Sequence, residues 1–413
     1  KLILAQRRFR NQSDVPAGAP WLYDPRGSGV SVVNLPDNIG DPDAGASFTM
    51  AYEVVVAGFT GGWYDASVVY RDWALKNAKW TRQGSIHQRT DVPNWIKKAP
   101  LYMLMSDFRS SAAVVDIMRK FRALVPTDAD IGLHQRQWYR NDTWPRPDTD
   151  IGVFPDYVAR PGLKSAVKSL NSLGVRNVAY INGRDFNQKA ASWPSFADAA
   201  CHAYIGEQDN CTLTPDPNIS CRGSAIGPDP SSCKSNLSCT RTAVPDANAA
   251  TATTPRRELW GDFTAVMNPA HPKWQQLVTN QSLQLFGLGM DGVYVDQASS
   301  FPPQPCMNKR GRGVGASWVE GNRAMFDAIR KEAPKQVVLM SESNGDVLLD
   351  GVNTNLAIYG WLACGNVPAF QAVYSGYTIN VGLLGFPATL NGTEDKHNFA
   401  FLLGWQLIYG HIP

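Results

Sequence analysis

The sequence of 413 residues lacks the features that mark several large classes of protein. No apolar run approaches the roughly 18 residues that a membrane-spanning helix needs. The apolar part of the first residues is too short for a signal peptide, so we expect any signal to have been removed or to lie outside this sequence. The formal net charge is only +3, from 39 basic and 36 acidic residues. This balance gives no reason to expect nucleic acid or an anionic membrane as a partner.

The motifs of several common catalytic sites are also missing. The sequence contains no His-Glu-x-x-His zinc motif, no Walker phosphate loop and no Gly-x-Ser-x-Gly nucleophile elbow. Its six histidines are scattered. We therefore expect neither a metal nor an organic cofactor. The content of 44% hydrophobic and 18% charged residues is that of a globular chain that can bury a full core.

Glycosylation motifs are dense and indicate a secreted or extracellular protein. A few Asn-x-Ser/Thr motifs arise by chance in any chain, so the argument depends on their density and not on any single one. The seven predicted glycosylation sites are Asn11, Asn141, Asn210, Asn218, Asn236, Asn280 and Asn391.

Cysteines point to the same compartment. Five of the seven lie between residues 201 and 239, at spacings of ten, ten, twelve and six residues. These spacings match no compact zinc motif, so they favour disulfides over a metal site. The pairing is open, and at least one of the seven must stay free or pair elsewhere. The candidate disulfide residues are Cys201, Cys211, Cys221, Cys233, Cys239, Cys306 and Cys364.

The chain divides into two predicted regions. Residues 1–90 are rich in β-type sequence and predict a portion of a β-sandwich domain, closed by a linker helix over 63–77. In that helix Trp63, Val68, Trp73 and Leu75 fall on or near one face.

Residues 91–413 alternate short apolar strands with amphipathic helices, which is typical of a parallel sheet with crossover helices. No dinucleotide fingerprint follows the first strand, so a (β/α)8 TIM barrel is favoured over a doubly wound sheet. The eighth strand is expected beyond Pro413, which would make this chain a section of a longer polypeptide. The predicted strands cover 101–107, 129–138, 176–183, 290–297, 336–343, 354–360 and 385–391.

A cysteine-rich insertion separates the third and fourth predicted strands, from residue 184 to about 258. Its content of Pro, Ser, Thr and Asn cannot fill a core. In a barrel, the loops after strands lie on the catalytic face, so the insertion can contribute to binding. The alternative is a glycosylated surface excursion without a role in binding.

Polar residues that follow the predicted strands are the candidate site residues, because the ends of barrel strands share one mouth. They are Asp107, His134 with Trp138, Asn182 with Arg184 and Asp185, Asp296 with Gln297, Glu342 with Asn344, and Trp361. Tryptophans such as Trp138 and Trp361 could stack on sugar rings, although most tryptophans belong to a core.

Two carboxylates stand out among them, Asp296 after the fourth strand and Glu342 after the fifth. Cleavage of a glycosidic bond needs such a pair, about 5 to 5.5 Å apart in a retaining enzyme, and neighbouring strands lie about 4.8 Å apart. The alternatives are a helix cap or turn residue for Asp296 and a solvated loop carboxylate for Glu342.

Residues 262–297 resemble the segment of barrel glycoside hydrolases in which a helix and Gly-x-Asp-Gly lead into strand four, with its terminal nucleophilic Asp. Residues 58–80 are similar to the end of the β-sandwich that precedes the barrel in several such families. The layout resembles α-amylase-like barrels and endo-α-N-acetylgalactosaminidases. The resemblance implies that Asp296 is a nucleophile and Glu342 a proton donor. The loop after Gln297, rich in Pro and containing Cys306, departs from those families.

Two hypotheses follow from the sequence. The first is a secreted, retaining glycoside hydrolase that cleaves an α-linked sugar from a glycan or polysaccharide. The second is a non-catalytic extracellular structural or carbohydrate-binding glycoprotein on the same scaffold, with an extracellular assembly partner. Carbohydrate is the expected partner in both, and the fold alone does not choose between them.

Overall fold

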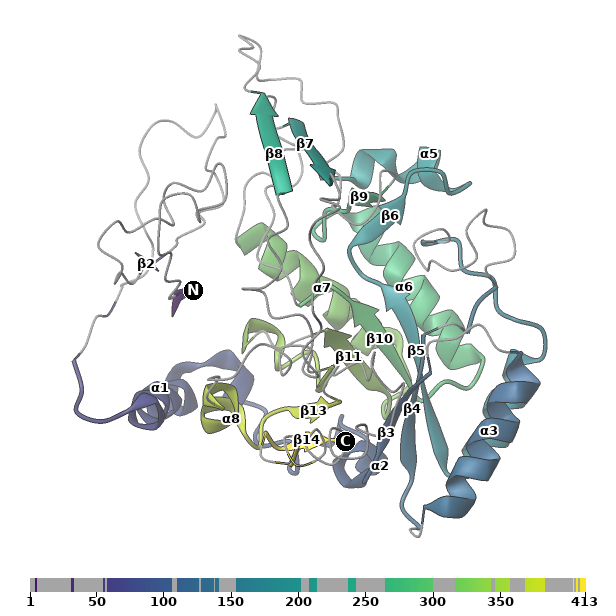
Figure 1. Cartoon of the computed structure of the whole chain (residues 1–413), viewed down its shortest axis with the longest axis horizontal. Coiled ribbons are helices and arrows are strands. Elements are labelled where there is room, and N and C mark those ends of the chain that lie inside the picture. The colour runs from purple at the N-terminus through teal and green to yellow at the C-terminus, as the bar shows by residue number, and fades with distance from the viewer. Residues whose placement is uncertain are drawn as a thin grey trace, which may run out of the picture.

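Eight parallel strands form the central sheet of the computed structural model (Figure 1). The residues that the structure describes are 4–5, 31–32, 55, 58–105, 110–125, 128–136, 138–140, 154–201, 208–213, 237–242, 264–299, 316–342, 346–356, 368–382, 404, 406–407 and 409–413.

The sheet closes into a (β/α)8 barrel. Its strands follow the order of the chain and are β3 (Tyr102–Met105), β4 (Ile131–Gln135), β5 (Val175–Asn182), β10 (Gly292–Asp296), β11 (Val338–Glu342), β12 (Thr354–Leu356), β13 (Ile379–Val381) and β14 (His411–Ile412). The backbone amide of Tyr102 donates a 2.7 Å hydrogen bond to the carbonyl of Pro413, which joins the first strand to the end of the eighth. The predicted fold class is confirmed.

The prediction of the eighth strand was wrong. The eighth strand does not lie beyond Pro413, because β14 occupies His411–Ile412 and pairs with β13. The seventh strand of the described sheet is β13 at Ile379–Val381, and the predicted strand at 385–391 lies outside the described residues. Both strands have only two or three residues, too few to produce the alternation by which strands are recognised in a sequence.

Helices occupy the four segments predicted between strands, 110–125, 160–174, 271–287 and 317–333, as α3 (Ser111–Leu124), α4 (Leu163–Ser172), α6 (Pro272–Gly287) and α7 (Ala316–Glu332). The shorter α8 (Ala369–Tyr374) was not predicted. The hydroxyl of Ser110 caps α3 by accepting a 3.2 Å hydrogen bond from the amide of Ala113. Gly174 and Gly289 follow α4 and α6 with φ of 70° and 96°, a conformation that favours glycine. Each glycine turns the chain from its helix into the next strand.

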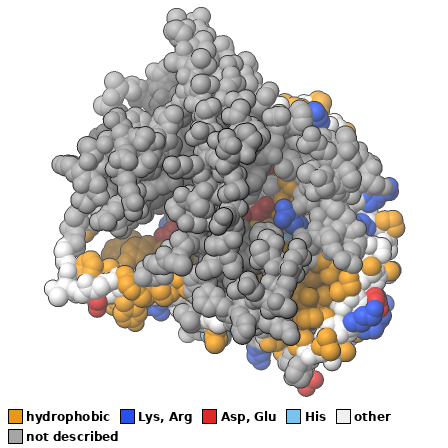
Figure 2. Space-filling view, viewed as in Figure 1, with side chains coloured by type: hydrophobic (Ala, Val, Ile, Leu, Met, Phe, Trp, Pro, Cys, Tyr) orange, Lys and Arg blue, Asp and Glu red, His pale blue; other side chains and the backbone are white. Residues whose placement is uncertain are grey.

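The segment before the barrel contains α1 (Trp63–Asn77), η3 (Lys79–Thr81) and α2 (Asn94–Lys98). The helix over 63–77 is confirmed, but its apolar face is not buried, since Trp63 and Trp73 are 41% and 54% exposed. The helix packs through Ser67 and Ala74 instead. Figure 2 shows hydrophobic side chains gathered over this part of the molecule. Upstream of residue 55 the structure describes only β1 (Leu4–Ala5) and β2 (Ser31–Val32), as an antiparallel pair, so the β-sandwich stays a prediction.

The excursion between the third and fourth barrel strands contains β6 (Asp185–Asn187), α5 (Trp193–Phe196), η5 (Ala197–Ala199), β7 (Gln208–Leu213), β8 (Leu237–Thr242) and β9 (Thr264–Val266). β6 pairs with β9 and β7 with β8, both antiparallel. Because β6 begins three residues after β5 ends, the ribbon of β6 and β9 starts at the carboxyl end of the barrel strands (Figure 1).

Aromatic side chains fill the barrel interior below its mouth. The rings of His134 and Tyr294 lie 4.6 Å apart, and Tyr180 packs 5.8 Å from Tyr294. The Tyr102 hydroxyl reaches across to the sulfur of Met340 at 3.2 Å. Among the described residues, no helix is both long and apolar enough to cross a bilayer.

Candidate active site

Asp296 lies at the carboxyl end of β10 and accepts three hydrogen bonds through its side chain. The Tyr294 hydroxyl donates to Oδ1 at 2.8 Å and the Tyr180 hydroxyl to Oδ2 at 2.9 Å. The amide of Gln297 donates to Oδ1 at 3.0 Å. Residues two apart on a strand face the same side, which places Tyr294 directly below Asp296. The three donors fix the direction of the carboxylate.

Asn182, at the end of the adjacent strand β5, extends this network. It stands opposite Asp296 in the register, and its Nδ2 donates to the Tyr180 hydroxyl at 3.3 Å. Tyr180 therefore accepts from Asn182 and donates to Asp296, an arrangement in which each hydrogen bond strengthens the other. The backbone amide of Gly183 also donates to the Asp296 carbonyl at 2.9 Å, which ties the two strand ends together.

Opposing effects act on the protonation of Asp296. Burial is the largest effect and raises the pKa of its carboxyl overall, although the hydroxyls of Tyr294 and Tyr180, the charge of Arg136 and the Gln297 amide lower it. The guanidinium of Arg136 lies 5.6 Å from the centre of the Tyr180 ring. Burial and the nearby Asp296 raise the pKa of both tyrosines well above the usual value, so both hydroxyls stay protonated donors.

Glu342 lies at the end of β11, the strand next to β10. The register pairs Val295 with Ser341, so the next residues along are Asp296 and Glu342. The charge of Glu342 also raises the pKa of Tyr294, the tyrosine that donates to Asp296. The Ser299 hydroxyl donates to the backbone carbonyl of Glu342 and links the turn after β10 to the end of β11. The fold thus brings the two predicted carboxylates to adjacent strand ends.

The alternative role of Asp296 as a helix cap does not match the structure. Residues 297–299 form a turn, and the side chain accepts hydrogen bonds from two tyrosines. Gln297 has a φ of 61°, in the left-handed region that a residue with a side chain rarely adopts. Its Oε1 is buried without a hydrogen-bond partner among the described residues. Backbone strain and an unpaired polar atom directly after Asp296 are typical of a functional site.

The other predicted site residues within the described part of the chain are buried deeper. His134 lies inside the barrel, where burial lowers its pKa to about 3 and keeps the ring neutral. Trp138 is buried against Tyr139 and Tyr157, and its indole nitrogen donates to the Tyr180 carbonyl at 2.6 Å. Arg184 is 2% exposed, and its carbonyl accepts from the Met267 amide at 2.8 Å. Their proposed contact with substrate stays a prediction.

Several predicted residues fall outside the described side chains. Asp107, Asn344 and Trp361 lie outside the described residues, as do Asn11, Asn141, Asn218, Asn236, Asn391, Cys221, Cys233, Cys306 and Cys364. Asn210, Cys211 and Cys239 lie in strands whose backbone alone is described. Asn280 is exposed on α6, and Cys201 is buried beside Val266 and Trp318.

Sequence reasoning missed Tyr180, Tyr294 and Arg136. A signal for them was available, because Tyr294 precedes Asp296 by two residues, Tyr180 precedes Asn182 by two, and Arg136 follows His134 by two. Because side chains alternate between the two faces of a sheet along a strand, the two residues of each pair lie on the same face.

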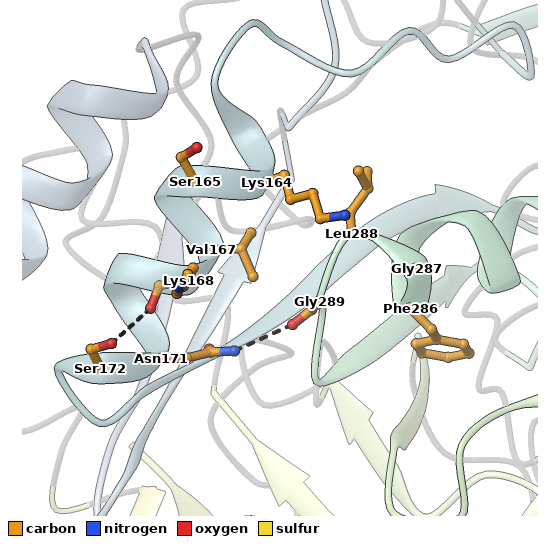
Figure 3. Close-up of a pocket in the computed structure, with 10 residues that line it drawn as sticks. All are labelled: Lys164, Ser165, Val167, Lys168, Asn171, Ser172, Phe286, Gly287, Leu288 and Gly289. Carbon is orange, nitrogen blue, oxygen red and sulfur yellow. Dashed lines mark hydrogen bonds between the residues drawn. The ribbon is translucent and has the colours of Figure 1, made fainter.

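A separate hollow lies on the outer wall of the barrel, between α4 and the end of α6 (Figure 3). Lys164, Lys168, Phe286 and Leu288 line it. None of the network around Asp296 contributes to this hollow, so it is not the candidate active site.

The model of a family described as a domain of unknown function, DUF6259, matches residues 48–217 and 239–386. The chain belongs to the DUF6259 family. A protein of Monosiga brevicollis named "Putative glycoside hydrolase 22789" is 24% identical over an alignment of 386 residues that covers 86% of this chain and 28% of that protein.

Solved structures share the fold of this DUF6259 domain. The complex of Bifidobacterium bifidum alpha-N-acetylgalactosaminidase NagBb with GalNAc has a TM-score of 0.54 at 13% identity, covering 77% of this chain and 48% of that one. A quadruple mutant of the same enzyme has a TM-score of 0.57 at 12% identity, covering 83% and 56%. The chain therefore spans about a quarter to a half of the length of the relatives that it matches, and the likeness extends to a glycosidase-type barrel fold.

Proposed function

We propose that this protein is a retaining glycoside hydrolase that cleaves an α-linked sugar from a glycan or polysaccharide. The observation that carries the proposal is the Asp296 carboxylate, held by Tyr294, Tyr180 and the Gln297 amide at the strand end next to Glu342. The names of the similar proteins, a glycoside hydrolase and an alpha-N-acetylgalactosaminidase, support the same reaction class.

In the proposed reaction, an Asp296 oxygen attacks the anomeric carbon of the sugar while the bond from that carbon to the leaving oxygen breaks. Glu342 gives its proton to the leaving oxygen, and the sugar becomes an ester on Asp296. Ionised Glu342 then takes a proton from water, whose oxygen displaces Asp296 from the anomeric carbon. The sugar leaves with its original configuration, and both carboxyl groups return to their starting states.

The donors around Asp296 suit a nucleophile. A nucleophilic carboxylate must be ionised before attack, and hydrogen bonds to the charged form favour ionisation. Two tyrosine hydroxyls and a backbone amide supply them without competing for the proton, since both tyrosines stay neutral. The same donors would restrain the carboxylate oxygens in line with the sugar carbon.

Hydrolysis of aryl glycosides tests the proposal. The panel consists of α- and β-linked galactosides, N-acetylgalactosaminides, glucosides and N-acetylglucosaminides, and the product configuration is followed by NMR. We expect Asp296→Asn to lower kcat/KM by about 1,000-fold or more. Glu342→Gln should lower it by about 100- to 10,000-fold for poor leaving groups and much less for dinitrophenol, which leaves without a proton.

Two surface variants serve as matched controls. Asp116→Asn on α3 and Glu332→Gln on α7 make the same chemical changes at exposed positions and should leave kcat/KM unchanged. If no glycoside in the panel is cleaved, the non-catalytic carbohydrate-binding scaffold is the better description. Equal activity of Asp296→Asn and the wild type would remove the assigned nucleophile.

We also propose that the protein is a secreted or extracellular glycoprotein with disulfides. The seven glycosylation motifs and the clustered cysteines support this location. Expression in eukaryotic cells should yield protein in the medium that loses mass on treatment with an N-glycosidase. An Asn280→Gln variant, altered at an exposed helical site, should carry one glycan less. Recovery of unglycosylated protein from the cell interior alone would contradict the proposal.

A further inference from the structure

Asp185 is a third carboxyl group at the candidate site, and its backbone is fixed from two sides. Its amide donates a 2.6 Å hydrogen bond to Oδ1 of Asn182, which also accepts from the Arg184 amide at 2.8 Å. As the first residue of β6, Asp185 also stands opposite Val266 of β9. The backbone at Asp185 is therefore held by Asn182 at the end of β5 and by the partner strand β9.

A continuous chain of contacts joins Asp185 to the proposed nucleophile. Asn182 accepts from the Asp185 amide and donates to the Tyr180 hydroxyl, which in turn donates to Asp296 at 2.9 Å. Electrostatic repulsion from Asp296 acts directly on the Asp185 carboxyl. The two carboxyl groups thus lie near each other at the carboxyl end of the barrel strands, one on β10 and one just after β5.

The Asp185 carboxyl is almost completely withdrawn from solvent. The residue is 5% exposed, and its Oδ1 is buried without a hydrogen-bond partner among the described residues. Burying a charged carboxylate with an unpaired oxygen is costly, and a second negative charge on Asp296 adds to the cost. A neutral carboxyl avoids both penalties and has a proton to donate.

Within the part of the chain that the structure describes, two charged groups act on the Asp185 carboxyl. Arg184 beside it favours the charged carboxylate, and Asp296 on β10 opposes it. The partner strand β9 contributes Thr264, Ala265 and Val266, which do not titrate. Burial, the largest effect, together with Asp296 outweighs Arg184 and raises the pKa of Asp185 to about 7.

We propose that Asp185 is a substrate-binding residue whose neutral carboxyl group donates a hydrogen bond to a ring hydroxyl of the sugar bound at Asp296. The inference rests on the proposed glycosidase function and adds a residue to its binding site. A polyhydroxylated sugar ring fits the unpaired buried oxygen, because its hydroxyl groups both accept and donate hydrogen bonds. Binding would then weaken as pH rises and Asp185 loses its proton.

Kinetics in a background without the acid/base residue tests this role. With a dinitrophenyl glycoside and Glu342→Gln, no protonation of the leaving group is needed, so an alkaline fall in kcat/KM reports another group. We expect kcat/KM to fall by about 3- to 10-fold as pH rises through the pKa of about 7, which is the loss of one hydrogen bond to the sugar, and then to level off. Adding Asp185→Asn, which keeps a hydrogen-bond donor but cannot ionise, should abolish this fall. Asp198→Asn, a surface change further along the same excursion, should not.

Two results would overturn the inference. One is an alkaline fall that persists unchanged in the Asp185→Asn variant. The other is a loss of more than about 100-fold at every pH in that variant, which would indicate that the carboxyl group itself reacts. Asp185→Leu, unable to donate, should lose about 3- to 10-fold at every pH, as expected for one neutral hydrogen bond.

A binding measurement separates failure of this inference from failure of the proposed function. The probes are free D-galactose, N-acetylgalactosamine, D-glucose and N-acetylglucosamine, observed by saturation-transfer NMR at about pH 6 and about pH 8.5. If no glycoside is hydrolysed but a sugar binds at the lower pH only, and Asp185→Asn binds it at both, then hydrolysis is wrong and the role of Asp185 holds. Binding of no sugar, or equal binding by the wild type at both pH values, overturns the role of Asp185.

Discussion

The Tyr294 hydroxyl donates a 2.8 Å hydrogen bond to Oδ1 of Asp296, two residues further along the same strand. This pair combines a barrel-interior aromatic residue with a carboxylate at the barrel mouth. The ring of Tyr294 packs against His134 in the core, so the position of its hydroxyl is set by core packing. The core of the barrel thereby determines where the candidate nucleophile points.

Replacement of Tyr294 by Phe tests this coupling. A hydrogen bond to a charged group contributes about 1.5 to 3 kcal/mol, so kcat/KM should fall by about 10- to 100-fold. The bond favours ionised Asp296, so its loss raises the pKa of Asp296. Because activity needs ionised Asp296, the variant should lose activity at a higher pH than the wild type as the solution is acidified. The check is the pH dependence of kcat/KM.

Tyr102→Phe provides the control for Tyr294→Phe. It removes a buried hydroxyl that contacts Met340 and makes no contact with Asp296. The acid limb of its pH profile should coincide with that of the wild type. A similar displacement in both variants would mean that general loosening of the core, and not the bond to Asp296, is responsible.

Arg89 anchors the segment before the barrel to the loop ahead of β12. Its guanidinium donates to the carbonyls of Leu349 and Asp350 at 3.1 and 3.0 Å and pairs with Asp91 at 2.7 Å. Arg89→Met should lower the free energy of unfolding by about 2 to 3 kcal/mol, less than for a fully buried ion pair because Asp91 is 34% exposed. Urea unfolding measures this free energy. Arg119→Met, at an exposed pair on α3, should change it by less than about 0.5 kcal/mol.

The same ion pair predicts a pH dependence of stability. Burial would raise the pKa of Asp91, but the hydrogen bonds and charge of Arg89 outweigh burial and lower it. A carboxyl whose pKa is lowered by folding stabilises the protein above its unfolded pKa of about 4 and loses this contribution as pH falls through the folded value. Unfolding midpoints of the wild type and Arg89→Met should therefore converge below about pH 4. A constant difference between them down to about pH 2 would contradict this account.

Replacement by alanine should change the stability of the fold in opposite directions at two glycines, Gly321 in α7 and Gly287 at the end of α6. A Cβ on Gly321 of α7 would lie 2.5 Å from the Ala270 nitrogen and 2.6 Å from the Pro269 carbonyl carbon. Gly321→Ala should therefore destabilise the fold by about 1 to 3 kcal/mol. A Cβ on Gly287 of α6 would meet nothing within 4 Å, so Gly287→Ala should stabilise the helix by about 0.5 to 1 kcal/mol. Thermal unfolding of the two variants measures both changes in stability.

Cys211 and Cys239 stand directly opposite each other in the antiparallel pair of β7 and β8. Opposed residues in such a pair have Cα atoms about 4.5 to 5.5 Å apart, within the range that a disulfide spans. We predict that these two residues are joined in protein purified under oxidising conditions. Peptide mapping without reduction should recover the two peptides linked, and Cys211→Ser should release them. Linkage of Cys211 to another cysteine would show that the strand register does not set the pairing.

The sequence was sufficient to predict the barrel and the candidate carboxylates. Long strands and helices have enough residues to display their periodicity, which identified β5, β10, β11 and the five longer helices. Parallel strands all end at one edge, so Asp296 and Glu342 could be predicted to lie together from their positions alone. The two-residue β14 and three-residue β13 have no such signal, and their positions depend on hydrogen bonds from neighbouring strands.

The sequence by itself therefore determined the barrel fold and which carboxylates end two neighbouring strands, because both follow from local periodicity. Only the tertiary structure decided that Tyr180 and Tyr294 hold Asp296, that His134 and Trp138 belong to the interior, and that Asp185 lies beside the proposed nucleophile. These relationships join residues on different strands, and they depend on strand register and on side-chain packing around the closed barrel, neither of which is encoded in a short stretch of sequence.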